Sequence, residues 1–149
     1  MRQFKWRLQR VLDVKKIEEN SRRNELMAVT ERLASTQSEY LLKKRMLADE
    51  VRRISTLEPA QRLNEQQFFM RYSQAATERI KKLKEKVTHL ESQQKEKIEQ
   101  VLAARRFREG LEKLREKARQ EYVAEQLALE QKELDEAGQN SFIRQNTAC

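Results

Sequence analysis

The segment Ser55-Thr56-Leu57-Glu58-Pro59 decides the fold, because it holds the only proline of the 149-residue chain. Only two glycines accompany it, Gly110 and Gly138. Proline and glycine are the residues that most often supply turns and end helices. The residue before a proline avoids helical backbone angles, whereas proline itself fits the first turn of a helix. The segment therefore predicts a single turn between two antiparallel helices, with Ser55 or Thr56 helping to cap the second.

Residues on both sides of this turn recur at alternating steps of three and four, the spacing of a coiled-coil seam. The seam before the turn is predicted to contain Leu26, Val29, Leu33, Thr36, Tyr40, Lys43, Leu47, Glu50, Ile54 and Leu57. The seam after the turn is predicted to contain Phe69, Ser73, Ala76, Ile80, Leu83, Val87 and Leu90. The spacing weakens over 94–104, and apolar residues resume in a shifted phase at Phe107, Leu111, Leu114 and Ala118.

These patterns predict an all-α fold, in which two long helices form an antiparallel coiled-coil hairpin. The expected single domain covers 1–149, with helices at about 3–56 and 60–137, a turn near 57–60 and a loose tail at 138–149. Gly138 is the expected C-terminal cap of the second helix. Phe4, Leu8, Val11 and Leu12 mark the early apolar face of the first helix, and Ile17 stands nearly alone among polar residues. The second helix is longer, so its last twenty or so residues have no partner. An uncovered helix is marginal in water, which favours a docking role.

The composition supports this architecture. Charged residues make up 38% of the chain, as do apolar residues, and only 6% are aromatic, which is typical of a coiled coil. The net charge of +8 is compatible with nucleic acid, an anionic membrane or an acidic protein, and does not choose among them. No apolar run is long enough to span a membrane and no signal peptide is evident. The single cysteine, Cys149, cannot form a disulfide within the chain, which is consistent with the cytosol.

The sequence offers no constellation for catalysis. His89 and Cys149 are the only histidine and cysteine, and they lie far apart. There are too few glycines for a phosphate-binding loop. Two helices cannot readily build a walled site for nucleophilic chemistry. We therefore expect no metal, no cofactor and no enzymatic activity.

An aromatic group opens the second helix. Phe68, Tyr72 and Ala75 are spaced by four and then three residues, so they share a helix face beside the predicted seam. Exposed aromatic residues in such a stripe indicate a protein-binding patch. Alternatively, these side chains broaden the seam near the turn.

Two basic segments have alternative interpretations. Arg105-Arg106-Phe107-Arg108 surrounds an aromatic residue with arginines, as a nucleic-acid-binding segment can, but arginines that flank a seam are ordinary. The N-terminal segment places Phe4, Trp6 and Leu8 among basic residues and could contact an anionic membrane. We favour packing of this segment on its own partner helix or on another protein.

Several segments resemble the FliJ family, small coiled-coil components of the bacterial flagellar type III export apparatus. The N-terminal segment 4–19, FKWRLQRVLDVKKIEE, is similar to the start of these proteins. Further similarities are QQFF at 66–69, LEKLREK at 111–117 followed by Tyr122, and LDEA at 134–137. Their order and spacing cover nearly the whole chain.

The resemblance implies an antiparallel two-helix coiled coil similar to the central stalk of rotary ATPases. Such a stalk enters the pore of the hexameric export ATPase, contacts the cytoplasmic domain of the export-gate membrane protein, and interacts with export chaperones. It acts in the cytoplasm, peripherally at the inner membrane, and hydrolyses nothing itself. The family's gate-binding surface falls here on Phe68, Tyr72, Ala75, Arg79 and an aromatic residue of the first helix, Tyr40. Tyr72 and Arg79 stand where an aliphatic residue and a histidine can stand in the family.

We therefore expect a flagellar export stalk. The residues expected to engage the ATPase pore are Arg2, Arg7, Arg10, Arg105, Arg106 and Arg108. One alternative is the equivalent stalk of a virulence-type secretion system or of another rotary ATPase. A second alternative, from a different class, is a cytoplasmic coiled-coil scaffold or a basic nucleic-acid-binding rod.

Overall fold

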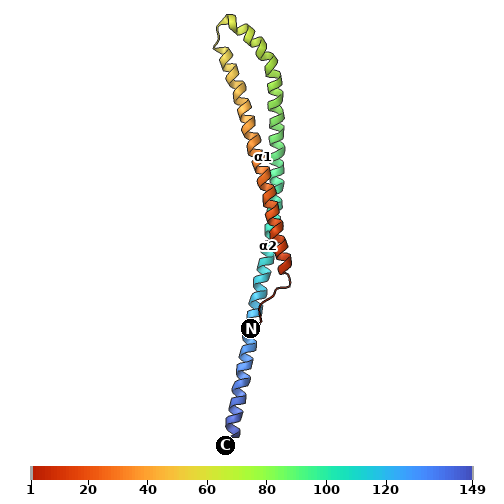
Figure 1. The fold of residues 1–149 in the computed structure, drawn as a ribbon, viewed down its shortest axis with the longest axis vertical. Helices are drawn as coiled ribbons and strands as arrows, with labels where there is room; N and C mark the ends of the chain where they lie inside the picture. The colour runs from red at the N-terminus through yellow and green to blue at the C-terminus, as the bar shows by residue number, and fades with distance from the viewer. Residues whose placement is uncertain (1, 149) are drawn as a thin grey trace. The chain divides into compact units, whose positions relative to one another are not determined.

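The computed structural model describes residues 2–148, which form two helices (Figure 1). Helix α1 covers Gln9–Ser55 and helix α2 covers Pro59–Thr147. The described residues contain no strand. Glu19 of α1 pairs with Arg108 of α2 and Glu25 with Lys97, whereas Arg53 pairs with Glu65, so residue numbers rise along one helix as they fall along the other and the helices are antiparallel. The predicted all-α helical hairpin is confirmed.

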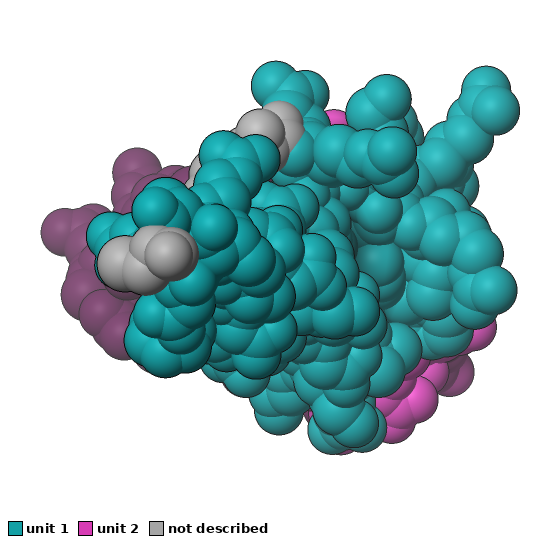
Figure 2. All heavy atoms as spheres, turned by 90° about the horizontal axis from the view of Figure 1, so that it is seen from below, with its two compact units in different colours: residues 1–19, 104–149 teal, residues 20–103 magenta. Residues whose placement is uncertain are grey.

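The chain divides into two compact units, coloured separately in Figure 2. The described part of unit 1 comprises residues 2–19 and 104–148, and unit 2 comprises Asn20–Ala103. In unit 1 the Nε of Arg115 donates a hydrogen bond to Gln9 over 2.8 Å. In unit 2 the Nζ of Lys97 lies 2.9 Å from the carboxylate of Glu25. Each unit therefore contains a segment from both helices. The single coiled-coil domain over 1–149 stays a prediction.

The turn between the helices is built from side-chain hydrogen bonds. The hydroxyls of Ser55 and Thr56 donate to carbonyls of the last turn of α1, over 2.7 and 2.8 Å, and do not cap α2. Arg62 reaches back from α2 and donates to the carbonyls of Ser55 and Leu57, over 3.1 and 2.9 Å. The bonds to Arg52, Arg53 and Ser55 satisfy carbonyl groups that α1 leaves unpaired at its C-terminus, and the bond to Leu57 fixes the turn that follows. Helix α2 begins at Pro59, as the lack of a proline N–H favours.

The predicted seam of unit 2 is confirmed on both helices. Val29, Leu33, Thr36 and Ile54 on α1 are buried, as is Leu90 on α2. The other predicted seam positions between 26 and 57 and between 69 and 90 are half-buried. The pairing of two helices offers one thin apolar layer in place of a core.

The predicted phase shift in α2 is wrong. Buried and half-buried positions continue the same spacing beyond Leu90, through Gln94, Lys97, Val101, Ala104, Arg108, Leu111, Arg115, Ala118 and Tyr122. Phe107 and Leu114, predicted in the seam, are 52% and 53% exposed. On α1, Leu12, Lys15, Glu19 and Arg22 supply the matching positions, so the seam does not lapse around Ile17. Charged side chains occupy it because their aliphatic stems pack while their heads find partners or water.

The N-terminal segment differs from the prediction, because α1 begins at Gln9 and not near residue 3. Residues 2–6 are not helical. The Tyr122 hydroxyl donates a hydrogen bond to the carbonyl of Arg2, and the rings of Phe4 and Tyr122 lie 5.4 Å apart. These contacts hold the segment against α2 and replace the first helical turns. Val11 is exposed, and Leu12 takes the buried position instead.

The end of α2 also differs, because the helix continues to Thr147 where a loose tail was expected from 138. Gly138 lies inside the helix and does not adopt the left-handed conformation that a C-terminal cap needs. A glycine within a helix costs only about 1 kcal/mol relative to alanine, and no proline follows to end the helix. Every described residue from 127 onward is exposed, which agrees with the expected uncovered segment.

Candidate interaction surfaces

Helix α2 presents an exposed stripe beside the seam of unit 2. Phe68, Tyr72, Ala75 and Arg79 follow one another at steps of four, three and four. Phe68 is 71% exposed and Tyr72 46% exposed, so the aromatic side chains do not broaden the buried seam. Exposed aromatic residues of this kind are typical anchors of protein interfaces.

Three residues of this stripe border a hollow between the helices. Tyr72, Ala75 and Arg79 line it from α2, and Lys43 and Met46 line it from α1. The hollow measures about 110 Å³. Its walls are completed by seam residues Ala76 and Ile80. The structure thus brings together three of the five predicted gate-binding residues, while Phe68 lies outside the lining.

Tyr40, the fifth residue, lies at a separate place. It is half-buried in the seam and lines a different hollow with Leu41, Lys84 and Val87. The Nζ of Lys44 lies 5.8 Å from the centre of its ring. Tyr40 and Tyr72 line no hollow in common.

The structure also reveals surface residues that the sequence interpretation missed. Arg79 lines a second hollow together with Lys43, Lys82 and Lys86. Lys82 and Lys86 continue the spacing of the exposed stripe by three and four residues. That spacing was the available signal, but the stripe predicted from it ends at Ala75, and the family resemblance adds only Arg79.

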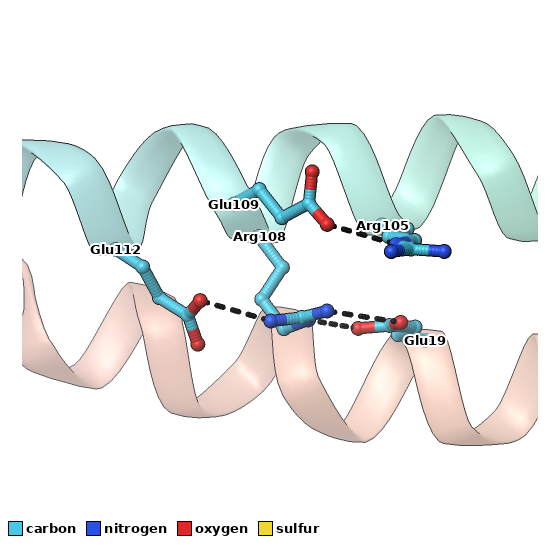
Figure 3. Close-up of polar contacts among 5 residues, drawn as sticks. All are labelled: Glu19, Arg105, Arg108, Glu109 and Glu112. Atoms are coloured by element: carbon cyan, nitrogen blue, oxygen red, sulfur yellow. Dashed lines mark hydrogen bonds and ion pairs between the residues drawn. The ribbon is translucent and has the colours of Figure 1, made fainter.

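The predicted arginines of unit 1 occupy two different environments (Figure 3). Arg108 lies in the seam, where its guanidinium pairs with the buried carboxylate of Glu19 and lies 2.9 Å from Glu112. These carboxylates, Glu19 first, raise the pKa of Arg108 above its ordinary value. Arg105 lies outside and pairs with Glu109 over 2.8 Å, which lowers the pKa of that carboxyl. Arg108 is therefore a structural residue of the seam.

The remaining predicted arginines are exposed but do not form one patch. Arg2, Arg7 and Arg10 lie in the N-terminal part of unit 1, whose contacts are with Arg115 and Tyr122. Residues 105 and 122 are separated by about 25 Å along a helix that rises 1.5 Å per residue. The basic side chains thus spread along the helices of the unit. Such a distribution suits contact with an extended acidic surface.

The described residues show no arrangement for metal chemistry. No group of three or more histidine, cysteine or acidic side chains could hold a metal ion there. His89 is exposed on α2, and Cys149 lies outside the described residues. Neither helix has a stretch that is both long and apolar enough to cross a bilayer in its described part.

The fold and these surfaces define the class of the molecule: a two-helix coiled-coil protein that presents its candidate binding residues on exposed helix faces. The chain matches the family model described as flagellar FliJ protein over residues 4–147. It therefore belongs to the FliJ family, whose members are structural components of flagellar type III export. Neither the curated proteins nor the solved structures gave a match to the chain.

Proposed function

We propose that this chain is the non-enzymatic stalk of the flagellar export apparatus, linking the hexameric export ATPase to the cytoplasmic domain of the membrane export gate and to export chaperones. The family match over 4–147 supports this proposal most directly. The same match favours the flagellar apparatus over a virulence-type system. The proposed place of action is the cytoplasm, at the cytoplasmic face of the inner membrane.

The gate contact is assigned to the stripe of unit 2. Phe68 and Tyr72 are exposed, and the hollow beside Tyr72 can receive a side chain of the partner. Burial of aromatic residues of this size supplies much of the free energy of a typical interface. Ala75 and Arg79 continue the surface, and Tyr40 belongs to it only if the gate domain extends to the neighbouring hollow.

The ATPase contact is assigned to the exposed arginines of unit 1. Guanidinium groups form paired hydrogen bonds with carboxylates, so Arg2, Arg7, Arg10, Arg105 and Arg106 suit an acidic pore lining. Arg108 would act indirectly, because its ion pair with Glu19 fixes the helices that present the others. Helix α2 carries residues of both surfaces without interruption. The proposed role is thus mechanical coupling and requires no reaction on the chain itself.

The test of the gate assignment is the double variant Phe68→Ala, Tyr72→Ala. We expect its affinity for the purified cytoplasmic gate domain, measured by isothermal titration calorimetry, to fall at least tenfold. The magnitude follows from about 2 kcal/mol or more for aromatic anchors of an interface. Circular dichroism should remain helical, because both side chains are exposed.

The matched control is Leu63→Ala, Met70→Ala, which removes two exposed apolar side chains from another face of the same stretch of α2. Its gate affinity should stay within about twofold of the wild type, because lone exposed apolar residues outside an interface carry little binding energy. Binding of the Phe68, Tyr72 variant to the export ATPase should also be retained. Equal gate affinity of wild type and a folded Phe68, Tyr72 variant would refute the site.

A further inference from the structure

The exposed stripe of α2 changes character beyond Ala75. Arg79, Lys82 and Lys86 continue it at steps of three and four and line a hollow of about 390 Å³. Lys43 enters the same hollow from α1. Glu39 is the only acidic residue in the lining, so four cationic side chains face one carboxylate. This hollow therefore has an excess of positive charge.

The cationic hollow adjoins the smaller hollow beside Tyr72. Lys43 and Arg79 line both, so the two form one groove, which we call the two-part groove. Its apolar part is bordered by Tyr72, Met46 and the seam residue Ile80. Its cationic part lies toward Lys86. The groove thus offers apolar contact at one end and positive charge at the other.

The cations of the groove lack partners within the described residues. No ion pair is formed there by Lys43, Arg79, Lys82 or Lys86, whereas Lys97 and Arg53 of the same unit are paired across the helices. Like charges three or four residues apart on a helix repel one another. Unpaired cations in this arrangement destabilise the free protein slightly, and an anionic ligand would relieve the repulsion.

We propose that the two-part groove binds a segment of a partner protein that carries two or three carboxylates next to an apolar anchor side chain. Arg79 and Lys86 are about 10 Å apart along α2, which sets the span of the carboxylates. Tyr72 lies about 10 Å to the other side of Arg79, where the apolar anchor binds. The inference rests on the proposed function for the identity of the partner, the export gate, but its chemistry follows from the groove alone.

A protein segment fits this groove better than other polyanions. A phosphate backbone or a lipid headgroup layer would satisfy the cations but leave the apolar part beside Tyr72 and Met46 unfilled. Each of the two hollows can hold a side chain of a partner protein. Complementary charge combined with a buried apolar anchor is also the usual composition of a specific protein interface.

The test is the double variant Lys82→Glu, Lys86→Glu, examined with the purified cytoplasmic gate domain in calorimetry at low and high salt. We expect at least a tenfold loss of affinity at low salt and a loss of most of the salt dependence, because the reversed charges repel the carboxylates. The matched control is Arg71→Glu, Lys81→Glu, which makes the same charge change at exposed positions outside the groove. It should bind within about threefold of the wild type. If the charge reversal unfolds the helix, Lys82→Gln, Lys86→Gln replaces it in the same measurement and should also weaken gate binding.

Two synthetic probes separate this inference from the proposed function. One is an extended peptide with two leucines followed, three residues later, by three glutamates, so that the first carboxylate lies about 10 Å from the apolar anchor. The other is single-stranded polyuridine. Peptide binding that is lost in the Lys82, Lys86 variant supports the groove, even if the gate domain binds neither protein. If Lys82→Glu, Lys86→Glu leaves gate binding unchanged while the separate variant Phe68→Ala, Tyr72→Ala weakens it, the groove is overturned and the proposed function stands. Binding of polyuridine but not of the peptide overturns it in favour of nucleic acid.

Discussion

At the scale of single residues, the main feature is the charged pair inside the seam of unit 1. Glu19 is only 3% exposed, at a position that coiled coils normally fill with an apolar side chain. Its carboxylate pairs with the guanidinium of Arg108, which Glu112 also contacts (Figure 3). Burial of such ions costs several kcal/mol each, so the pair persists only because each charge has a partner.

We predict that Glu19→Ala lowers the free energy of unfolding by about 2–4 kcal/mol, because it leaves a largely covered guanidinium with one partner fewer. The double variant Glu19→Leu, Arg108→Leu should regain most of this loss, since apolar side chains fill the seam without desolvation cost. Urea unfolding followed by circular dichroism measures both. Glu116→Ala, at an exposed pair with Arg119, is the control and should have a clearly smaller effect, because solvent screens an exposed ion pair. A Glu19→Ala effect no larger than the control would contradict the role of the pair.

These residues also mark the limit of prediction from the sequence. Leu111 and Ala118 occupy the seam as predicted, but the seam uses Arg108 and Arg115 where Phe107 and Leu114 were expected. The spacing alone is compatible with a seam through either pair of positions, and the apolar character of Phe107 and Leu114 favoured the wrong pair. The ring of Phe107 instead lies under the ammonium of Lys15, 4.7 Å from it. The carboxylate that makes a buried arginine tolerable comes from the other helix, so no pattern within α2 could identify it.

At the scale of elements, the sequence predicts the central parts of the two helices better than the start of α1 and the turn. The seam between 26 and 57 and between 69 and 90 could be predicted because apolar side chains occupy most of its positions. The beginning of α1 could not, because the contacts of Phe4 and Arg2 with Tyr122 are long-range and override local helix preference. The turn was located by Pro59, but its stabilisation by Arg62 again depends on a contact that spacing does not reveal.

The uncovered end of α2 provides a prediction at this scale. Residues 127–148 are exposed throughout, including Leu127, Leu134 and Phe142. Because they bury no side chain, truncation after Gln126 should change the free energy of unfolding by less than about 1 kcal/mol. Truncation after Ala118 should destabilise the protein clearly more, because it removes Tyr122 and its contacts with the N-terminal segment.

Urea unfolding of the two truncated proteins beside the full chain makes this comparison. A large loss of stability on truncation after Gln126 would show that the terminal segment packs on the rest of the chain. Equal stability of the two truncated proteins would show that Tyr122 and Phe4 contribute nothing. Both results would contradict the contacts described here.

At the scale of the whole molecule, ion pairs distributed along both units make stability depend on pH. Glu25, Glu50, Glu109 and Glu116 each have a pKa below the ordinary value of 4.5, mainly through hydrogen bonds from Lys97, Arg53, Arg105 and Arg119 respectively. The folded state therefore binds fewer protons than the unfolded state around this pH. Their stabilisation is complete above about pH 4.5 and is lost as the pH falls through the lowered pKa values.

We predict that the midpoint of thermal unfolding falls when the pH is lowered from 6 to below about 4. The fall should be smaller in Glu25→Gln, which lacks the titrating partner of Lys97 in unit 2. High salt should also reduce it, because these carboxylates are exposed enough for ions to screen them. An acid transition that is identical in wild type and Glu25→Gln would exclude a contribution from this pair.

The buried ion pair of unit 1 has a consequence for the alignment of the helices. A regular repeat of seven residues permits one helix to slide past the other by a whole repeat without exposing its apolar side chains. A step in one direction would set Glu19 against Val101 and Arg108 against Leu12. A step in the other direction would set Arg108 against Leu26 and Glu19 against Arg115. Either step sets Arg108 against a leucine and separates it from its buried carboxylate partner, and the cost of an unpaired charge in the seam disfavours both alignments.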